Sequence, residues 1–128
     1  MAYLEEKLEQ LEKAIKAWQV ALDEKYSDIT RDASIQRYEF TFELLWKVIK
    51  IYLKEKEGID CISPKSCFRE IRNLLNLTEE EVETCLQMVS DRNLSTHTYS
   101  EKMAKELYDK LANYLKISNK IYKEIKEK

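Results

Sequence analysis

A short polar segment, residues 91–99, carries the side chains best suited to chemistry. Arg92, His97 and Tyr99 supply a guanidinium, an imidazole and a phenol. His97 is the only histidine of the chain, and histidine is the side chain that exchanges protons most readily near neutral pH. Arginine offers a planar fork of donors that matches a phosphate group. This pair therefore suits attack on a phosphodiester without a metal ion.

The spacing of Arg92 and His97 limits how they can cooperate. Five residues of an α-helix turn through roughly 500°, so the two side chains would not share a face of a continuous helix. Either the helix ends between them or the site is completed from elsewhere, and a two-fold axis near this segment would supply a second copy of both residues. In the alternative interpretation, His97 caps or packs a helix end and Arg92 forms a surface ion pair with Asp91 worth at most about 1 kcal/mol.

Composition predicts that helices position this segment. Gly58 and Pro64 are the only glycine and proline, and the turns of a β-sheet would need more of both. Apolar residues repeat at spacings of three and four, which is typical of amphipathic helices. We predict an all-α fold: an antiparallel up-and-down bundle of four to five helices, dimeric, forming a single domain over residues 1–128. The predicted helices cover approximately residues 4–26, 35–58, 64–75, 78–94 and 104–125.

Two helices carry further predictions. Phe40 and Trp46 widen the apolar stripe of the second helix, which we therefore expect to be central and covered on several sides. Ser63-Pro64 and Thr78 to Glu81 have the pattern of helix N-termini, the latter as a capping box.

Charge and cysteine content narrow the function classes. A net charge of −2 gives no overall basic surface for nucleic acid, although a local basic cleft at a dimer seam stays open. The first residues are charged and no stretch approaches a membrane span, so we expect a cytoplasmic protein. Cys61, Cys67 and Cys85 do not have the spacing of metal ligands, so we expect neither a metal nor a cofactor. We expect all three thiols to be reduced, with Cys67 and Cys85 packing as small apolar side chains.

The Arg92-x4-His97-x-Tyr99 pattern resembles the R-x4-H-x-Y motif of HEPN-domain proteins, specifically the HepT-like branch also called nucleotidyltransferase substrate-binding proteins. Residues 36–47 resemble the second helix of that family. Ser63-Pro64, Phe68-Arg69-Glu70 and residues 91–99 also lie where the family has them, and the resemblance covers approximately residues 4–115.

This resemblance implies a dimeric helical bundle in which two R-x4-H motifs face each other. Many HEPN proteins are metal-independent ribonucleases, and HepT-like members are usually encoded beside a small nucleotidyltransferase (MNT) as a toxin–antitoxin pair. In such a pair the partner transfers AMP onto the motif tyrosine, here Tyr99, and silences the ribonuclease. Two alternatives remain: a non-catalytic subunit that binds a nucleotide or substrate for a nucleotidyltransferase, and a plain dimerisation scaffold.

The resemblance assigns roles to the motif and leaves its surroundings open. Arg92 would bind the phosphate, and His97 would act as base or acid. Asn93, Ser95 and Thr96 would support orientation at most. The second helix offers Arg37, Glu43 and Lys47 as candidates to line a cleft. The four-residue spacing of Glu39, Glu43 and Lys47 equally describes an ordinary solvated helix face, which is the interpretation we favour.

Overall fold

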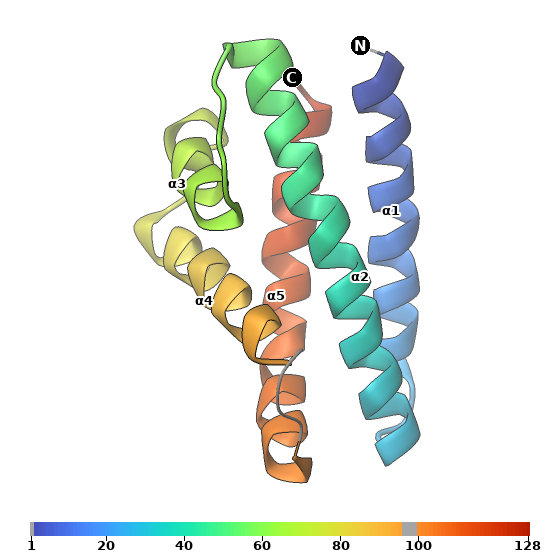
Figure 1. The fold of residues 1–128 in the computed structure, drawn as a ribbon. Coiled ribbons are helices and arrows are strands. Elements are labelled where there is room, and N and C mark those ends of the chain that lie inside the picture. The colour runs from blue at the N-terminus through green and yellow to red at the C-terminus, as the bar shows by residue number, and fades with distance from the viewer. Residues whose placement is uncertain (1, 96–99) are drawn as a thin grey trace.

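The computed structural model describes residues 2–95 and 100–128, and within these ranges it contains helices and no strand (Figure 1). The elements are α1 (Ala2–Asp23), α2 (Asp28–Tyr52), the π-helical segment η1 (Leu53–Glu57), α3 (Pro64–Leu74), α4 (Glu79–Ser95) and α5 (Glu101–Lys126). The longer helices α1, α2, α4 and α5 alternate in direction, and α3 lies beside α4 at one side (Figure 1). The prediction of an up-and-down helical bundle is confirmed.

Helix α2 is the centre of the bundle, as its broad apolar stripe predicts. It contacts α1, α3, α5 and η1. Its Tyr38 is fully buried, with its ring centroid 5.8 Å from that of Trp18 on α1 and 5.8 Å from that of Tyr114 on α5. The Tyr38 hydroxyl donates to the backbone carbonyl of Met88 on α4 at 2.6 Å. One side chain thus ties α2 to three neighbouring helices.

The expectation for Phe40 on the same helix is wrong. Its side chain is 56% exposed, and Trp46 is only partly buried. Tyr38, Phe42 and Leu45 follow one another at spacings of four and three and face the core. Phe40 is two positions from both Tyr38 and Phe42, so it is turned by about 200° from each and points away from the core.

Local capping sequences set where the helices begin. Ser63 accepts from the backbone N–H of Ser66, and Pro64 follows it at the first helical position of α3. At the start of α4, the Thr78 backbone N–H donates to Glu81 at 2.9 Å and the Glu81 N–H donates to the Thr78 hydroxyl at 3.0 Å. Both predicted N-termini are confirmed.

Helix ends agree less closely with the prediction. Helix α1 ends at Asp23 rather than near Tyr26. The second helix does stop at Gly58, but its last turn, η1, is π-helical. Gly58 has φ 67°, a left-handed conformation that glycine adopts without steric cost and that closes a helix.

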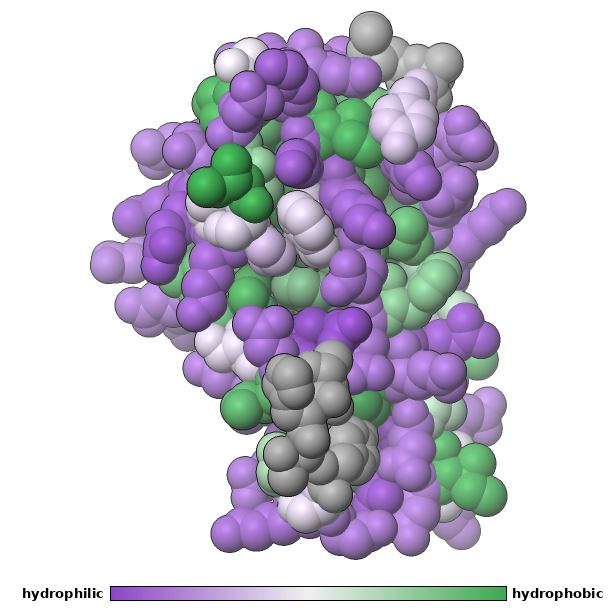
Figure 2. All heavy atoms as spheres, in the orientation of Figure 1, coloured by the Kyte–Doolittle hydropathy of each residue, from purple (hydrophilic) through white to green (hydrophobic). Residues whose placement is uncertain are grey.

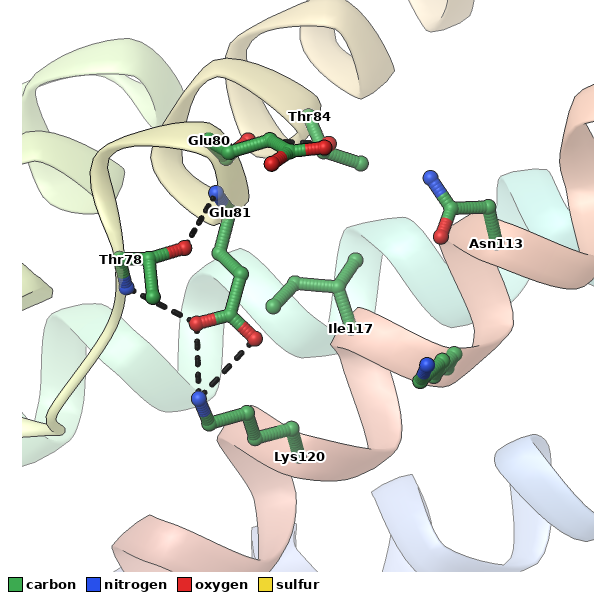
Figure 3. A pocket seen from close by; sticks show the side chains of 8 residues that line it. Thr78, Glu80, Glu81, Thr84, Asn113, Ile117 and Lys120 are labelled. Carbon is green, nitrogen blue, oxygen red and sulfur yellow. Dashed lines mark hydrogen bonds and ion pairs between the residues drawn. The ribbon is translucent and has the colours of Figure 1, made fainter.

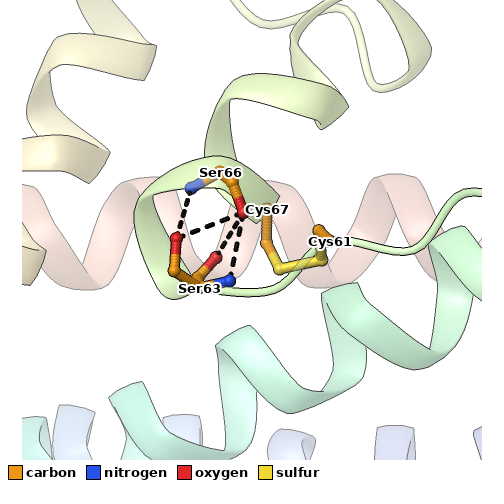
Figure 4. Close-up of a disulfide and its surroundings, with 4 residues drawn as sticks. All are labelled: Cys61, Ser63, Ser66 and Cys67. Carbon is orange, nitrogen blue, oxygen red and sulfur yellow. Dashed lines mark hydrogen bonds between the residues drawn. A yellow bond between two sulfur atoms is a disulfide. The ribbon is translucent and has the colours of Figure 1, made fainter.

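Two cysteines form a disulfide, which contradicts the prediction that the thiols are reduced. Cys61 and Cys67 are bonded across a six-residue separation, with Cα atoms 5.1 Å apart (Figure 4). The chain reverses at the Ser63 cap, so the first turn of α3 carries Cys67 back over Cys61, and both side chains are buried. Cys85 remains a free, buried thiol, and burial raises its pKa to about 12.

Reduction of the Cys61–Cys67 bond is expected to lower the free energy of unfolding by about 2 kcal/mol, because opening so short a loop returns limited entropy to the unfolded chain. Urea unfolding with and without dithiothreitol measures this difference. Cys61→Ser should lie near the reduced wild type and should not respond to the reductant. Equal unfolding curves for oxidised and reduced wild type would contradict the expectation.

The surface shown in Figure 2 is mainly hydrophilic and carries several separate apolar patches. Among the large apolar side chains that are exposed, Ile62 precedes α3, Leu94 lies near the end of α4, and Ile29 and Phe40 lie on α2. In the described ranges, no helix combines the length and apolar character needed to cross a bilayer.

Candidate functional site

The sequence motif spans the end of α4. Arg92 and Asn93 lie in its last turn, and Ser95 is its final residue. Thr96, His97 and Tyr99, together with the side chain of Ser95, lie outside the described residues. The geometry of the site can therefore be built from Arg92 and its neighbours.

Arg92 faces the central helix through Glu43. A guanidinium nitrogen of Arg92 lies 3.7 Å from Glu43 Oε1, and the indole N–H of Trp46 donates to Glu43 Oε2 at 3.2 Å. One carboxylate thus joins the motif arginine to an aromatic ring of α2. Glu43 is half-exposed and Arg92 more sheltered, with side-chain exposures of 43% and 21%. Solvent therefore reaches this ion pair.

This contact corrects our interpretation of Glu43. We favoured an ordinary solvated helix face for Glu39, Glu43 and Lys47, whereas Glu43 contacts the motif arginine. Lys47 is exposed one turn further along α2. Arg37 lies beside Gln36 and Phe40, and these three residues of α2 line a hollow. Of the three cleft candidates, the structure brings Glu43 to Arg92.

Asp91, the residue before Arg92, is a buried carboxylate that accepts from buried Tyr114 and from the exposed side chains of Gln87 and Lys110. Its Oδ2 accepts from Lys110 Nζ at 3.2 Å and from the Tyr114 hydroxyl, both on α5, and its Oδ1 accepts from Gln87 at 3.1 Å. Only 8% of Asp91 is exposed. A buried carboxylate is unfavourable unless it is paired and hydrogen-bonded, and these donors supply both.

Two buried tyrosines near Asp91, Tyr38 and Tyr114, have raised pKa values. Burial raises the pKa of Tyr114 far above its usual value, and the hydrogen bond to Asp91 adds to the increase. Burial also raises the pKa of Tyr38, with a further contribution from the negative charge of Asp91. Both phenols therefore stay protonated at physiological pH and act as donors, Tyr114 to Asp91 and Tyr38 to the Met88 carbonyl.

The beginning of α5 is held by a separate ionic contact. Arg31 of α2 is buried, and it donates to Glu101 in the first turn of α5 at 2.7 Å and to Asp32 at 2.9 Å. Its hydrogen bond to Glu101 is the main cause that raises its pKa. Ser100 caps α5 by accepting from the Met103 N–H. Residues 92 and 101, on either side of the undescribed part of the motif, are thus both tied to α2.

Sequence reasoning recognised Arg92 but missed the role of Asp91, which it treated as a partner for a surface ion pair. The sequence does contain a pattern that predicts a buried Asp91. Asp91 follows Cys85 and Met88 at spacings of three, on the buried stripe of its helix, so the pattern places a carboxylate where an apolar side chain is expected.

Another polar hollow lies away from the motif. It has a volume of about 320 Å³ between the start of α4 and α5, and its walls include Thr78, Glu81, Asn113 and Lys120 (Figure 3). Lys120 contacts Glu81 at 2.7 Å and lowers the pKa of that carboxyl group. Because Glu81 also caps α4, these charges serve the helix N-terminus. Among the residues described, no group of three His, Cys, Asp or Glu side chains is placed to hold a metal ion.

Comparison with known proteins places these features in a wider context. The model of the family described as "Nucleotidyltransferase substrate binding protein like" matches residues 2–127. A crystal structure of a protein from Thermus thermophilus is similar, with a TM-score of 0.84 and 38% sequence identity over 90% of this chain and 98% of that one. Among curated proteins, none matches this chain.

Proposed function

Because the chain belongs to the nucleotidyltransferase substrate binding protein like family, we propose that it is the HepT-like toxin of a HEPN/MNT pair. In this proposal it is a homodimeric, metal-independent ribonuclease that a small nucleotidyltransferase silences by adenylylation of Tyr99. The observation that carries the proposal is the position of Arg92. Its guanidinium lies at the end of α4, partly open to solvent, in the part of the chain that contains the R-x4-H-x-Y motif.

The chemistry assigns one task to each motif residue. Arg92 binds the scissile phosphate and stabilises the charge that develops on it. His97 removes the proton of the RNA 2′-hydroxyl, and the 2′-oxygen attacks phosphorus. The bond to the 5′-oxygen breaks, and that oxygen receives a proton from a general acid. In a homodimer, the second His97 supplies this acid, because each chain has a single histidine.

Glu43 explains how an acidic protein can keep an arginine ready for an anion. Its carboxylate holds the guanidinium at 3.7 Å, a loose ion pair that is partly exposed and therefore weak. A bound phosphate carries the same sign of charge and offers more acceptor oxygens, so it competes well for the same donors.

Adenylylation of Tyr99 would inhibit the ribonuclease by placing a negative charge near Arg92. Transfer of AMP from ATP joins the tyrosine oxygen to the α-phosphorus and releases pyrophosphate. The product carries a phosphodiester charge and a bulky nucleoside, seven residues after Arg92 in the sequence. That phosphate repels the RNA backbone and pairs with the guanidinium, so modification blocks the site by charge and by volume.

The second candidate is a nucleotide- or substrate-binding subunit of a two-component nucleotidyltransferase. The description of the family favours it, because it names substrate binding rather than cleavage. Here Arg92 would bind the phosphates of a nucleotide without breaking a bond. The net charge of −2 also fits a small ligand better than a long polyanion.

Incubation with RNA in the presence of EDTA separates the two candidates. For the ribonuclease, we expect cleavage by the unmodified protein. After treatment with ATP and a small nucleotidyltransferase encoded beside it, we expect cleavage to stop and the intact mass to rise by one or more AMP groups on Tyr99. Tyr99→Phe should cleave RNA and resist silencing. Nucleotide binding to wild type that Arg92→Ala abolishes, without RNA cleavage, would instead establish the binding subunit.

A further inference from the structure

The last turn of α4 is fixed from two directions by consecutive residues. Asp91 contacts Lys110 and Tyr114 of α5, whereas Arg92 contacts Glu43 of α2. Consecutive residues of an α-helix point about 100° apart, so one turn can face both neighbours at once. The direction of Arg92 toward α2 therefore depends on how this turn is rotated against α5.

An anchor is needed at this place because a helix end is intrinsically loose. The last carbonyl groups of a helix lack partners within it, so its final turn frays unless tertiary contacts hold it. The neighbouring apolar residue Leu94 is 57% exposed, and it adds little packing at the end of α4. The contacts of the buried Asp91 carboxylate with Lys110 and Tyr114 supply an attachment to α5 that Leu94 does not.

The contact of Asp91 with α5 is made by a carboxylate rather than by an apolar side chain, and this difference indicates its role. An apolar side chain at this depth would stabilise the fold about as well, because desolvation of the buried Asp91 carboxylate offsets much of its attraction to Lys110, whose side chain is 45% exposed. Hydrogen bonds add direction. Asp91 Oδ2 accepts from both Lys110 and Tyr114 of α5, and these two donors restrain the rotation of the turn as well as its distance from α5. Asp91 Oδ1 accepts from Gln87 one turn earlier on α4, which holds the carboxylate in place on its own helix.

We propose that Asp91 is a positioning residue for Arg92: the Asp91 carboxylate, through its contacts with Lys110 and Tyr114 of α5, sets the direction in which the guanidinium is presented to a phosphate. This inference rests on the proposed function for the identity of the phosphate, which is that of RNA. The positioning itself is a property of the free protein and can be measured without catalysis.

The test uses Asp91→Asn, which keeps the shape of the side chain and removes its charge, and Tyr114→Phe, which removes one donor. The matched control is Asp109→Asn, which breaks the exposed Lys105–Asp109 ion pair on the same helix α5. RNA cleavage is measured over a range of RNA concentrations in EDTA, at a temperature at which circular dichroism shows all four proteins to be folded. The Arg92 Nε–H signal in ¹H–¹⁵N NMR spectra, assigned with Arg92→Lys, reports the guanidinium directly.

We expect Asp91→Asn to lower kcat about 10-fold to 100-fold with little change in KM, because a displaced group loses transition-state contacts more than binding. Tyr114→Phe should lie between wild type and Asp91→Asn, and Asp109→Asn should match wild type. The Arg92 Nε–H signal should shift toward the position of a solvated arginine in Asp91→Asn and stay in place in Asp109→Asn.

Two outcomes would overturn the inference: an Arg92 signal that Asp91→Asn leaves unchanged, or a kcat per folded site equal to that of wild type. A purely structural role for Asp91 predicts a lower melting temperature with both of these readouts unchanged. If wild type cleaves no RNA while Asp91→Asn still moves the Arg92 signal, the ribonuclease proposal fails and the positioning role stands.

Discussion

Replacing His97 by alanine is expected to lower the rate of RNA cleavage by about 10²-fold to 10⁴-fold, because a positioned acid or base contributes a factor of that size. His97 is the only histidine of the chain, so no other imidazole can take over its task. Arg92→Ala should cause a loss of similar size, and Arg92→Lys should recover only part of it, since lysine keeps the charge without the planar fork. Arg72→Ala, which removes an exposed arginine of α3, is the matched control.

Mixed dimers extend this experiment to the second copy of the chain. If the two-fold axis brings two His97 side chains to one site, a dimer of one wild-type chain and one His97→Ala chain should lose most of its activity. Chains carrying different affinity tags allow that species to be purified and assayed with EDTA present. Half of the wild-type rate would mean that each chain completes its own site, and the full rate would exclude a role for the second histidine.

Much of the fold could be predicted because the information is local. The spacing of apolar residues along α5 and the caps at Ser63 and Thr78 are decided within a few positions of the chain. The same applies to Gly58, whose left-handed conformation ends the second helix as predicted. These signals act on one helix at a time, so a single sequence is sufficient to find them.

The contacts around Arg92 could not be predicted in the same way, since they join residues from distant parts of the chain. Glu43 and Arg92 belong to α2 and α4, and the spacing of Glu43 on its own helix also fits a solvated face. The bond between Cys61 and Cys67 depends on how sharply the chain turns before α3. The motif itself indicated Arg92, His97 and Tyr99 through resemblance, and their chemistry remains a prediction for experiment.

The second prediction with a large expected effect concerns the stability of the helical core, at Tyr38. Tyr38→Ala is expected to lower the free energy of unfolding by about 3–5 kcal/mol, the range for removing a buried aromatic ring. The ring contacts α1 and α5, and its hydroxyl satisfies the Met88 carbonyl of α4, three residues before Asp91. Because small domains are commonly stable by only about 5–15 kcal/mol, this single change would consume a large part of the total.

Phe40→Ala is the matched control for this loss, since it removes an aromatic ring from the same helix two positions away. Phe40 is 56% exposed and Tyr38 is fully buried, so we expect the control to cost less than about 1 kcal/mol. Tyr38→Phe separates the ring from the hydroxyl and should cost about 1–3 kcal/mol, the penalty for leaving the Met88 carbonyl without its donor. Urea unfolding of the three variants at one protein concentration gives the comparison. A Phe40→Ala loss that equals that of Tyr38→Ala and grows on dilution would instead place Phe40 in a dimer interface, where stability depends on protein concentration.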